Sequence, residues 1–451
     1  ILTLKVIKGV TEEIQFPIEI TIIVNAVERT SLGDDTIKSE NPYKENILHG
    51  TDPVLKEELI PVTIADNGKV TYADTHTKWY KYEEKKWANA VILKSGVTYE
   101  IGEVIPEKDI ESYFVWVPKY KYKLFDMGEY TTYINGKPTE PTKAKEIQIE
   151  FTQEETTDTN TSCVSPKVAG ESGTCEVGKW MTHPAFQNFD VTGLWVGKFE
   201  TGNDNGIIVK PNVPSWRNVN VATFFKTSYN YKRELDSHMM KNTEWGAVAY
   251  LSHSKYGVND EIRINNNSNY ITGYASTDGA DQSSYPGTTG TTEKITQAYN
   301  IETGYKASTT GNITGIYDMS GGTYEYVAGV MNGTTGMSGL TSAELTNYSK
   351  YFDVYPSNSA ETTWNNRILG DAAGEMGPFY YYKEDNNITY YHNNWYEDFS
   401  HFILLSNPWV IRGGVYPDGV LASQFFFGRS TGAALANSSR LVLTIKKEVQ
   451  L

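Results

Sequence analysis

Cysteine is scarce in this sequence, and its scarcity excludes several classes of site. Only 2 Cys occur among 451 residues, too few for a cysteine-rich scaffold or a zinc ribbon. The 7 His are scattered, with no HExxH pattern and no pair four residues apart, which argues against a zinc or iron site built from histidines. No run of about 20 apolar residues occurs, so the sequence predicts no membrane-spanning helix.

Basic residues are also in the minority. The chain has 40 Lys and Arg against 55 Asp and Glu, a formal net charge of -15. Proteins that bind nucleic acids or anionic membranes normally present a basic face, so both classes are disfavoured. Aromatic residues, in contrast, make up 13% of the chain, with 32 Tyr and 10 Trp. Disordered chains are poor in aromatics, so this composition indicates a folded protein.

The pattern along the chain divides it into four parts. We expect an N-terminal β-strand segment at residues 1–35, a small β module or linker at 36–111, one main domain at 112–446 and a tail at 447–451. Two strands alone are not a stable domain. The first segment is therefore expected to complete a sheet with a segment upstream, to pair with a neighbouring subunit, or to pack as a hairpin on the main body.

Helix signals are few, and the main domain is predicted to be α+β with many short strands. Residues 242–252 form the clearest helix, capped by Asn242 or Thr243, with Trp245 and Val248 on its apolar face. A second helix is predicted over 343–352. The remaining sequence is rich in glycine and asparagine between short apolar runs, which is typical of strands joined by turns.

Both cysteines fall in a polar stretch, residues 152–178, that is predicted to be a surface loop. Cys163 and Cys175 are either free thiols or a disulfide that closes a small ring, and we expect the disulfide. Such a ring stabilises a fold by about 3 kcal/mol on the chain-entropy model. A disulfide in turn implies an oxidising compartment.

No known catalytic spacing appears in the sequence. The G-x-S-x-G elbow and the nucleotide-binding glycine loops are absent. Asp260 and Glu261, followed by Asn265–Asn267, offer oxygen ligands for a hard cation, but the spacing is not that of an EF-hand, and a solvated loop is the favoured alternative.

Four short motifs stand out by their order and spacing. They are Val115-Trp116-Val117-Pro118, Thr243-Glu244-Trp245, a segment from Asp318 through Gly321 to Glu325, and Arg412-Gly413-Gly414. Their order over residues 112–446 resembles that of the formylglycine-generating enzyme, or sulfatase-modifying factor, family. The resemblance implies a C-type-lectin-like domain there, with the small all-β region before it.

The departures from the family pattern concern its chemistry. The family's enzymes carry a pair of cysteines downstream of Arg-Gly-Gly that bind copper and activate oxygen, whereas this chain has no Cys after Cys175. An enzyme of this type is therefore not expected. Gly322 stands where the family's Asn helps to bind calcium. We expect no cofactor, and the resemblance leaves calcium binding open.

What remains resembles the non-enzymatic branch of the family. This branch includes the variable proteins diversified by mutagenic retroelements and pilin-like surface proteins of gut Firmicutes. Between Gly413 and Ser439 only Gln424 belongs to the residue types that this diversification does not produce (Lys, Glu, Gln, Met and Trp). An ordinary loop-and-strand region of low charge would have the same composition, so both interpretations stay open.

The resemblance implies a ligand-binding or adhesion protein, extracellular or displayed at the cell surface. Its partner would be a protein or glycan on another cell or surface; the alternative is a structural subunit of an extracellular filament or pilus, whose partners would be identical subunits. The predicted exposed, ligand-binding residues are Tyr416, Asp418, Val420, Leu421, Ser423, Gln424, Phe426, Thr431 and Leu435. Tyrosine, serine and asparagine suit adaptable binding surfaces.

The motif residues themselves are predicted to be structural. Arg412 either pairs with a ligand carboxylate or, as we expect, with an acid such as Glu325. Glu244 is expected to be a buried acid satisfied by backbone amides, and Trp245 and Trp409 are expected to lie in the core.

Overall fold

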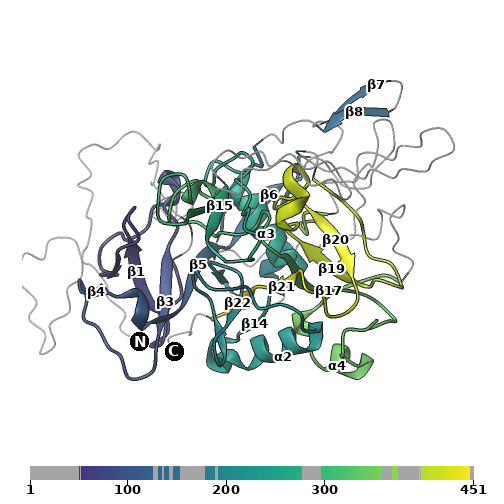
Figure 1. Ribbon diagram of the computed structural model, residues 1–451. Helices are drawn as coiled ribbons and strands as arrows, with labels where there is room; N and C mark the ends of the chain where they lie inside the picture. Colours follow the sequence, from purple (N-terminus) through teal and green to yellow (C-terminus); the bar gives the residue numbers. More distant parts are fainter. Residues whose placement is uncertain are drawn as a thin grey trace, which may run out of the picture. The chain divides into compact units, whose positions relative to one another are not determined.

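The computed structural model describes residues 50, 52–124, 131–134, 137–141, 146–152, 178–187, 191–276, 296–357, 368–373, 396 and 398–446 (Figure 1). Their fold is mixed α and β, mostly sheet with few helices, which confirms the predicted class at this level. The predicted strands of residues 1–35, the tail 447–451 and the predicted Cys163–Cys175 disulfide lie outside the described residues.

The larger sheet has eight strands, and every neighbouring pair is antiparallel. Across the sheet they are β14 (His238–Met239), β22 (Leu441–Leu443), β11 (Gly193–Gly197), β5 (Ile110–Pro118), β3 (Asn89–Leu93), β1 (Ile60–Ile64), β2 (Val70–Tyr72) and β4 (Val104–Ile105). The central strand β5 contains the Val115–Pro118 motif and is buried along almost its whole length, which suits its apolar sequence. The boundary predicted at residue 111 falls inside this sheet, because β3 pairs along β5.

The second sheet has five strands and mixed directions. They are β18 (Asp353–Tyr355), β17 (Tyr324–Met331), β19 (Trp409–Arg412), β20 (Phe427–Ser430) and β21 (Asn437–Ser439). The central strand β17 runs parallel to β18 and β21 and antiparallel to β19. This sheet carries the Glu325 and Arg412 motifs, so it organises the C-terminal region.

The remaining described strands form small sheets. They are β6 (Tyr120–Lys123) between β9 (Ile149–Phe151) and β10 (Trp180–Thr182), and the pairs β7 (Thr131–Ile134) with β8 (Lys137–Pro141), β12 (Gly202–Asn203) with β13 (Ile207–Ile208), and β15 (Tyr274–Ser276) with β16 (Thr296–Ala298).

Three α-helices occur among the described residues. They are α2 (Val221–Tyr231), α3 (Asn242–Ser252) and α4 (Ser342–Asn347). The described 3₁₀ segments are Tyr82–Glu84, Glu107–Asp109, Pro184–Phe186, Arg233–Leu235, Tyr305–Ala307, Ser349–Tyr351 and Tyr416–Leu421. The helix predicted over 343–352 is therefore shorter than expected, because a 3₁₀ turn replaces its C-terminal part.

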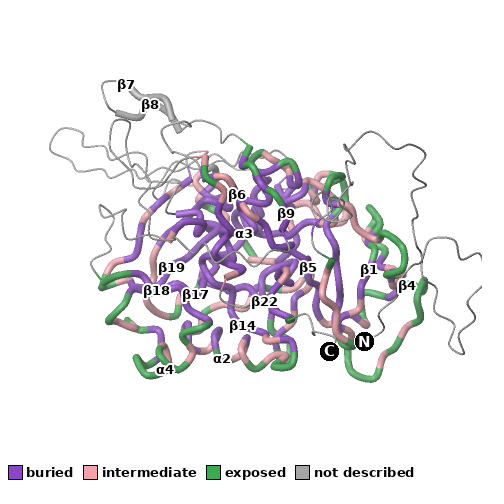
Figure 2. The backbone as a smooth tube through the Cα atoms, turned by 180° about the vertical axis from the view of Figure 1, so that it is seen from behind, coloured by how far each residue is buried: buried purple, intermediate pink, exposed green. Residues whose placement is uncertain are grey.

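Helix α3 has the predicted bounds, but its surroundings differ from the prediction. All eleven of its residues are buried, so it has no solvent-facing side (Figure 2). It contacts β5 of the larger sheet and β17 of the smaller one, and both sheets therefore cover it. Lys241, not Asn242 or Thr243, is the N-cap residue. A helix that is apolar on all sides is expected in such a position.

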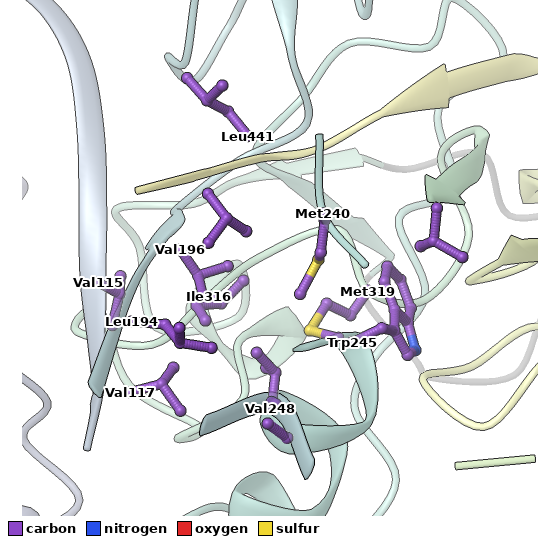
Figure 3. Packing of buried hydrophobic residues seen from close by; sticks show 14 of the residues in the cluster. Val115, Val117, Leu194, Val196, Met240, Trp245, Val248, Ile316, Met319 and Leu441 are labelled. Carbon is purple, nitrogen blue, oxygen red and sulfur yellow. The ribbon is translucent and has the colours of Figure 1, made fainter. Parts of the chain in front are cut away.

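The core around α3 is built from both sheets and from residues between them. The side chains that meet there are labelled in Figure 3: Val115 and Val117 of β5, Leu194 and Val196 of β11, Trp245 and Val248 of α3, Leu441 of β22, and Met240, Ile316 and Met319. Trp245 and Trp409 are both fully buried, which confirms their predicted place in the core.

One short segment belongs to both sheets. Strand β21 pairs with β17 of the smaller sheet, and β22, which follows after Arg440, pairs with β11 and β14 of the larger one. Arg440 is fully buried and forms an ion pair with Glu325 of β17, with Nε 2.9 Å from Oε2. Its Nη1 and Nη2 atoms donate to the carbonyls of Gly197 and Tyr317, each at 2.9 Å. Arg440 therefore holds the two sheets at their junction.

The Arg440–Glu325 pair yields a stability prediction. At pH 8, R440M leaves the buried Glu325 carboxylate without its cation and should reduce the free energy of unfolding by about 3–5 kcal/mol. The double variant R440M/E325L should recover part of this loss, since no charge is then buried. Urea unfolding of the two single variants and the double variant measures the coupling.

The matched control is R233M, which removes an exposed arginine that stacks on Tyr229 and should cost less than about 1 kcal/mol. Strictly additive effects of R440M and E325L would contradict the assigned pairing.

A close approach of backbone to α3 yields a second prediction. A Cβ atom at Gly246 would lie 1.9 Å from the carbonyl oxygen of Gly370. Because backbone cannot move aside cheaply, G246A should destabilise the fold by more than about 3 kcal/mol. G96A, at an open position with φ of +80°, should cost only about 1–2 kcal/mol. Thermal unfolding compares the two, and equal losses would contradict the packing.

Candidate functional site

The turn after β19 decides where the predicted binding residues lie. Gly413 and Gly414 have φ values of 81° and 74°, in the left-handed region that favours glycine. A Cβ atom at Gly414 would lie 2.4 Å from the Cβ atom of Ala422. The chain therefore doubles back tightly after Arg412, and the segment that follows packs onto the protein.

The predicted face is exposed only in part. Leu435 is 70% exposed, and Tyr416, Asp418, Leu421 and Thr431 are half-buried. The expected exposure of Ser423, Gln424 and Phe426 is wrong, since at most 2% of each is exposed. The side chain of Val420 lies outside the described part.

Two of these buried residues are held by polar contacts of the core. The Ser423 hydroxyl donates to the Asp398 carboxylate. The Gln424 carbonyl accepts hydrogen bonds from Trp245 Nε1 at 2.7 Å and Arg412 Nη2 at 3.2 Å. These contacts give both residues a structural place beneath the surface.

The predicted Arg412–Glu325 pair is wrong, although the two residues lie opposite each other on β19 and β17. Glu325 pairs with Arg440 instead. The Arg412 guanidinium donates to the carbonyls of Asp371 at 3.1 Å and Ala372 at 3.2 Å, in addition to Gln424. Carbonyl oxygens surround this cation, so Arg412 fixes loops and presents no free charge to a ligand.

Glu244 is buried as predicted, but a side chain as well as a backbone amide contacts its carboxylate. Its Oε2 atom accepts from the Lys241 amide at 2.8 Å, and its Oε1 atom lies 2.9 Å from His238 Nε2. The expectation of backbone amides alone is therefore only half right.

A pocket of about 350 Å³ lies beside the five-stranded sheet. The strands contribute Tyr324, Ile411, Gly428, Arg429, Ser430 and Asn437, and the connecting segments contribute Phe399, His401, Asn407, Asp418 and Phe426. Two of the nine predicted ligand-binding residues, Asp418 and Phe426, line it, and Thr431 directly follows the lining residue Ser430. We therefore take this pocket as the candidate site.

Stacked aromatic rings form one wall of the pocket. Tyr324 stacks on Phe426 with ring centroids 5.5 Å apart, and Phe426 stacks on Phe399 at 5.4 Å, both with an interplanar angle of 29°. His401 meets Phe399 edge-on at 5.1 Å. We call these stacked rings, Tyr324, Phe426 and Phe399, the aromatic ladder. Its rings offer an apolar surface of fixed shape to a ligand.

Asp418 supplies a carboxylate at the pocket wall. Its Oδ2 atom accepts from the Val415 amide at 3.0 Å, and the Tyr324 hydroxyl donates to the same carboxylate. Burial raises the pKa of Asp418 to about 6, despite these two donors. No cation of the described residues forms an ion pair with it. The carboxylate is therefore an anion stabilised by donors alone.

The other polar groups of the pocket are tied to the protein. The Ser430 hydroxyl accepts from the Tyr326 hydroxyl at 2.6 Å and from Asn437 Nδ2 at 3.2 Å. Arg429 Nη1 donates to the Phe402 carbonyl at 3.1 Å. Burial lowers the pKa of His401, which favours its neutral form at pH 7. These groups are held in place before any ligand binds.

A second set of contacts links two predicted residues that do not line the pocket. Tyr416 meets Tyr270 edge-on at 5.6 Å, and the Arg217 guanidinium lies 4.3 Å from the centre of the Tyr270 ring. Arg217 Nη1 donates to the Leu435 carbonyl at 2.7 Å. Tyr416 and Leu435 are thus linked to each other through Tyr270 and Arg217.

Asp318 and the proposed cation ligands have structural partners. Asp318 accepts from Asn265 Nδ2 and from the Gly273 amide, both at 2.9 Å. Gly321 turns the chain beside Asn265 at a φ of 72°. Within the described ranges, no group of three or more His, Cys, Asp or Glu side chains is arranged to hold a metal ion.

The chain matches no protein-family model and no curated protein. In the part of the chain that the structure describes, no helix combines the length and apolar character needed to cross a membrane.

Sequence reasoning missed much of the pocket. Phe399, His401 and Asn407 precede the Arg-Gly-Gly motif and were not candidates. Tyr324 lies in the segment from Asp318 to Glu325 but is not among the predicted binding residues. The signal that could have found it is its position beside Glu325, since residues adjacent in a strand point to opposite faces.

Asp418 gives this site a testable pH dependence. An unfolded Asp titrates near pH 4, so between about pH 4 and 6 the folded protein retains a proton that the unfolded chain has lost. Stability therefore falls as the pH rises through this range, by no more than about 3 kcal/mol from this group. D418N should remove that loss, so its stability relative to wild type should rise between pH 4 and pH 7.

Urea unfolding at both pH values measures the effect. Other buried acids, such as Asp318 and Glu325, titrate in both proteins and cancel in the difference. D66N, at an exposed position, serves as the control and should leave the pH profile unchanged. Parallel profiles for wild type and D418N would contradict a raised pKa.

Proposed function

We propose that this chain is an extracellular, surface-displayed ligand-binding or adhesion protein that contacts its ligand through the pocket beside β17, β19 and β20. The observation that carries the proposal is the aromatic ladder next to the Asp418 carboxylate. A rigid apolar wall with a few placed polar groups is the usual make-up of a binding site.

The proposal includes a C-type-lectin-like domain over residues 112–446, similar to the non-enzymatic branch of the formylglycine-generating enzyme family. Support comes from the roles of the motif residues. Glu244, Trp245, Asp318, Glu325 and Arg412 are all buried and hold the fold together. A fold of this kind does not determine a ligand, so the pocket must carry the functional argument.

Binding, not catalysis, is the function we propose. The sequence has no cysteine downstream of Arg412-Gly413-Gly414, so the thiolate chemistry of the related enzymes has no nucleophile here. Ser423, the first serine in the chain after that motif, is buried and donates to Asp398. The alternative, a filament or pilus subunit, depends on residues 1–35 and remains a prediction from the sequence.

A pocket-filling variant tests the proposal. N407W places a large side chain at the pocket wall, whereas I301W adds the same group at an exposed turn away from it. The labelled full-length chain is screened on a glycan array and with a displayed heptapeptide library. We expect N407W to weaken the binders found by at least about tenfold, and I301W to leave them unchanged, with equal melting temperatures for both variants.

Two outcomes would contradict the proposal. Binders that N407W and wild type retain equally would exclude this pocket as the contact. Antibody staining of unpermeabilised cells from the source organism tests display, and staining only after permeabilisation would exclude a surface location.

A further inference from the structure

Three strongly exposed apolar side chains belong to segments that line the pocket or contact such a segment. Leu405, Met337 and Leu435 are 61%, 70% and 70% exposed, the highest fractions among the large hydrophobic side chains described. Leu405 lies two residues before Asn407 of the pocket, and Leu435 two residues before Asn437.

Met337 contacts such a segment through a hydrogen bond. Its amide donates to the Thr431 hydroxyl at 3.0 Å, and Thr431 follows Ser430 of the pocket. We call Leu405, Met337 and Leu435 the apolar rim. Isolated exposed hydrophobics need no explanation, but three on segments that adjoin one pocket suit an interaction surface.

The composition of this surface favours a protein partner. Aromatic residues, methionine and arginine are enriched in protein interfaces, whereas lysine and glutamate are depleted. The pocket and its apolar rim contain the aromatic ladder, Met337 and Arg429, and no Lys or Glu is among the residues that line the pocket. An apolar rim offers little to the hydroxyl groups of a sugar.

Charge determines what the pocket would accept. Asp418 is a carboxylate at the wall that no cation of the described residues neutralises. The aromatic ladder lies beside it. Tyr324 and Phe399 cover the faces of Phe426, so the ladder offers an apolar surface for the aliphatic stem of a basic side chain. The whole chain has a net charge of -15, which raises the rate at which a cationic partner is encountered.

We infer that the pocket binds a basic side chain, lysine or arginine, of a protein partner. The ammonium or guanidinium group pairs with Asp418, the aliphatic stem lies against the aromatic ladder, and apolar residues of the partner cover the apolar rim. This inference rests on the proposed function, because it names the ligand class of the same pocket.

Other titratable and charged groups face Asp418 and must be separated from it. They are Tyr324 on β17, Tyr270 beside Tyr416, and His401 and Arg429 at the pocket wall. Burial raises the pKa of Tyr270, so its hydroxyl is neutral at pH 7.5. Protonation of His401 at low pH would repel a basic ligand, so it acts in the same direction as protonation of Asp418.

The test selects heptapeptides from a displayed random library on the intact chain at pH 7.5. We expect enrichment of lysine or arginine flanked by apolar residues. Synthetic copies in which norleucine replaces lysine, or citrulline replaces arginine, should bind at least about tenfold more weakly. D418N should weaken the basic peptides similarly, and D66N, which makes the same charge change at an exposed turn, should not.

The pH dependence separates Asp418 from His401. With a pKa of about 6, Asp418 is mostly protonated at pH 5 and ionised at pH 7.5, so affinity should rise about tenfold between them. D418N should bind with little pH dependence. A rise that persists in D418N would assign the effect to His401 and overturn the role of Asp418.

The remaining outcomes distinguish this inference from the proposed function. If the selected peptides show no preference for basic residues and N407W abolishes their binding, the inference is overturned. The pocket then remains a binding site. Glycan binding that N407W abolishes, with no peptide enriched, would overturn the protein partner alone. If N407W weakens neither peptide binding nor glycan binding, or if no binder is found, the result counts against both the inference and the proposed function.

Discussion

The buried Arg440–Glu325 pair is the interaction on which the two-sheet arrangement depends. Arg440 is the single residue between β21, which pairs in the smaller sheet, and β22, which pairs in the larger sheet. Its guanidinium reaches a carboxylate on β17 and two carbonyls outside that strand. A buried ion pair contributes little net stability compared with apolar packing, but an unpaired member costs a great deal. The pair therefore disfavours any arrangement of the two sheets that would separate the Arg440 and Glu325 side chains.

That junction also fixes the candidate site. Glu325 points to Arg440 in the interior, and its neighbour Tyr324 begins the aromatic ladder on the opposite face of β17. The second wall comes from the segment after Arg412, which Gly413 and Gly414 turn back over the sheet. The same elements that close the core thus place the ladder and Asp418 together.

The sequence pattern predicted one helix of this fold correctly and missed another. The helix at 242–252 was expected from its sequence and has those bounds. Helix α2 was missed, although Val221, Phe224, Phe225 and Ser228 are spaced as one helical face and Asn220 accepts the Thr223 amide as its N-cap. Its polar and aromatic residues of low helix propensity obscured the signal.

Contacts between distant residues could not be predicted in the same way. The sequence suggested Arg412 as the partner of Glu325, whereas the partner is Arg440. The pairing depends on which carbonyls surround each guanidinium, and the sequence does not contain that information. It likewise suggested an exposed face after Gly414, whereas half of that segment turns inward.

The burial that made this prediction partly wrong also gives the site its chemistry. Phe426 is buried because it lies between Tyr324 and Phe399, and this stack removes water from around Asp418. The resulting rise in the pKa of Asp418 is a measure of how poorly the fold solvates its charge. A ligand cation would stabilise the ionised carboxylate where water is missing. The free-energy penalty of burying the Asp418 charge would then favour a cationic ligand over a neutral one.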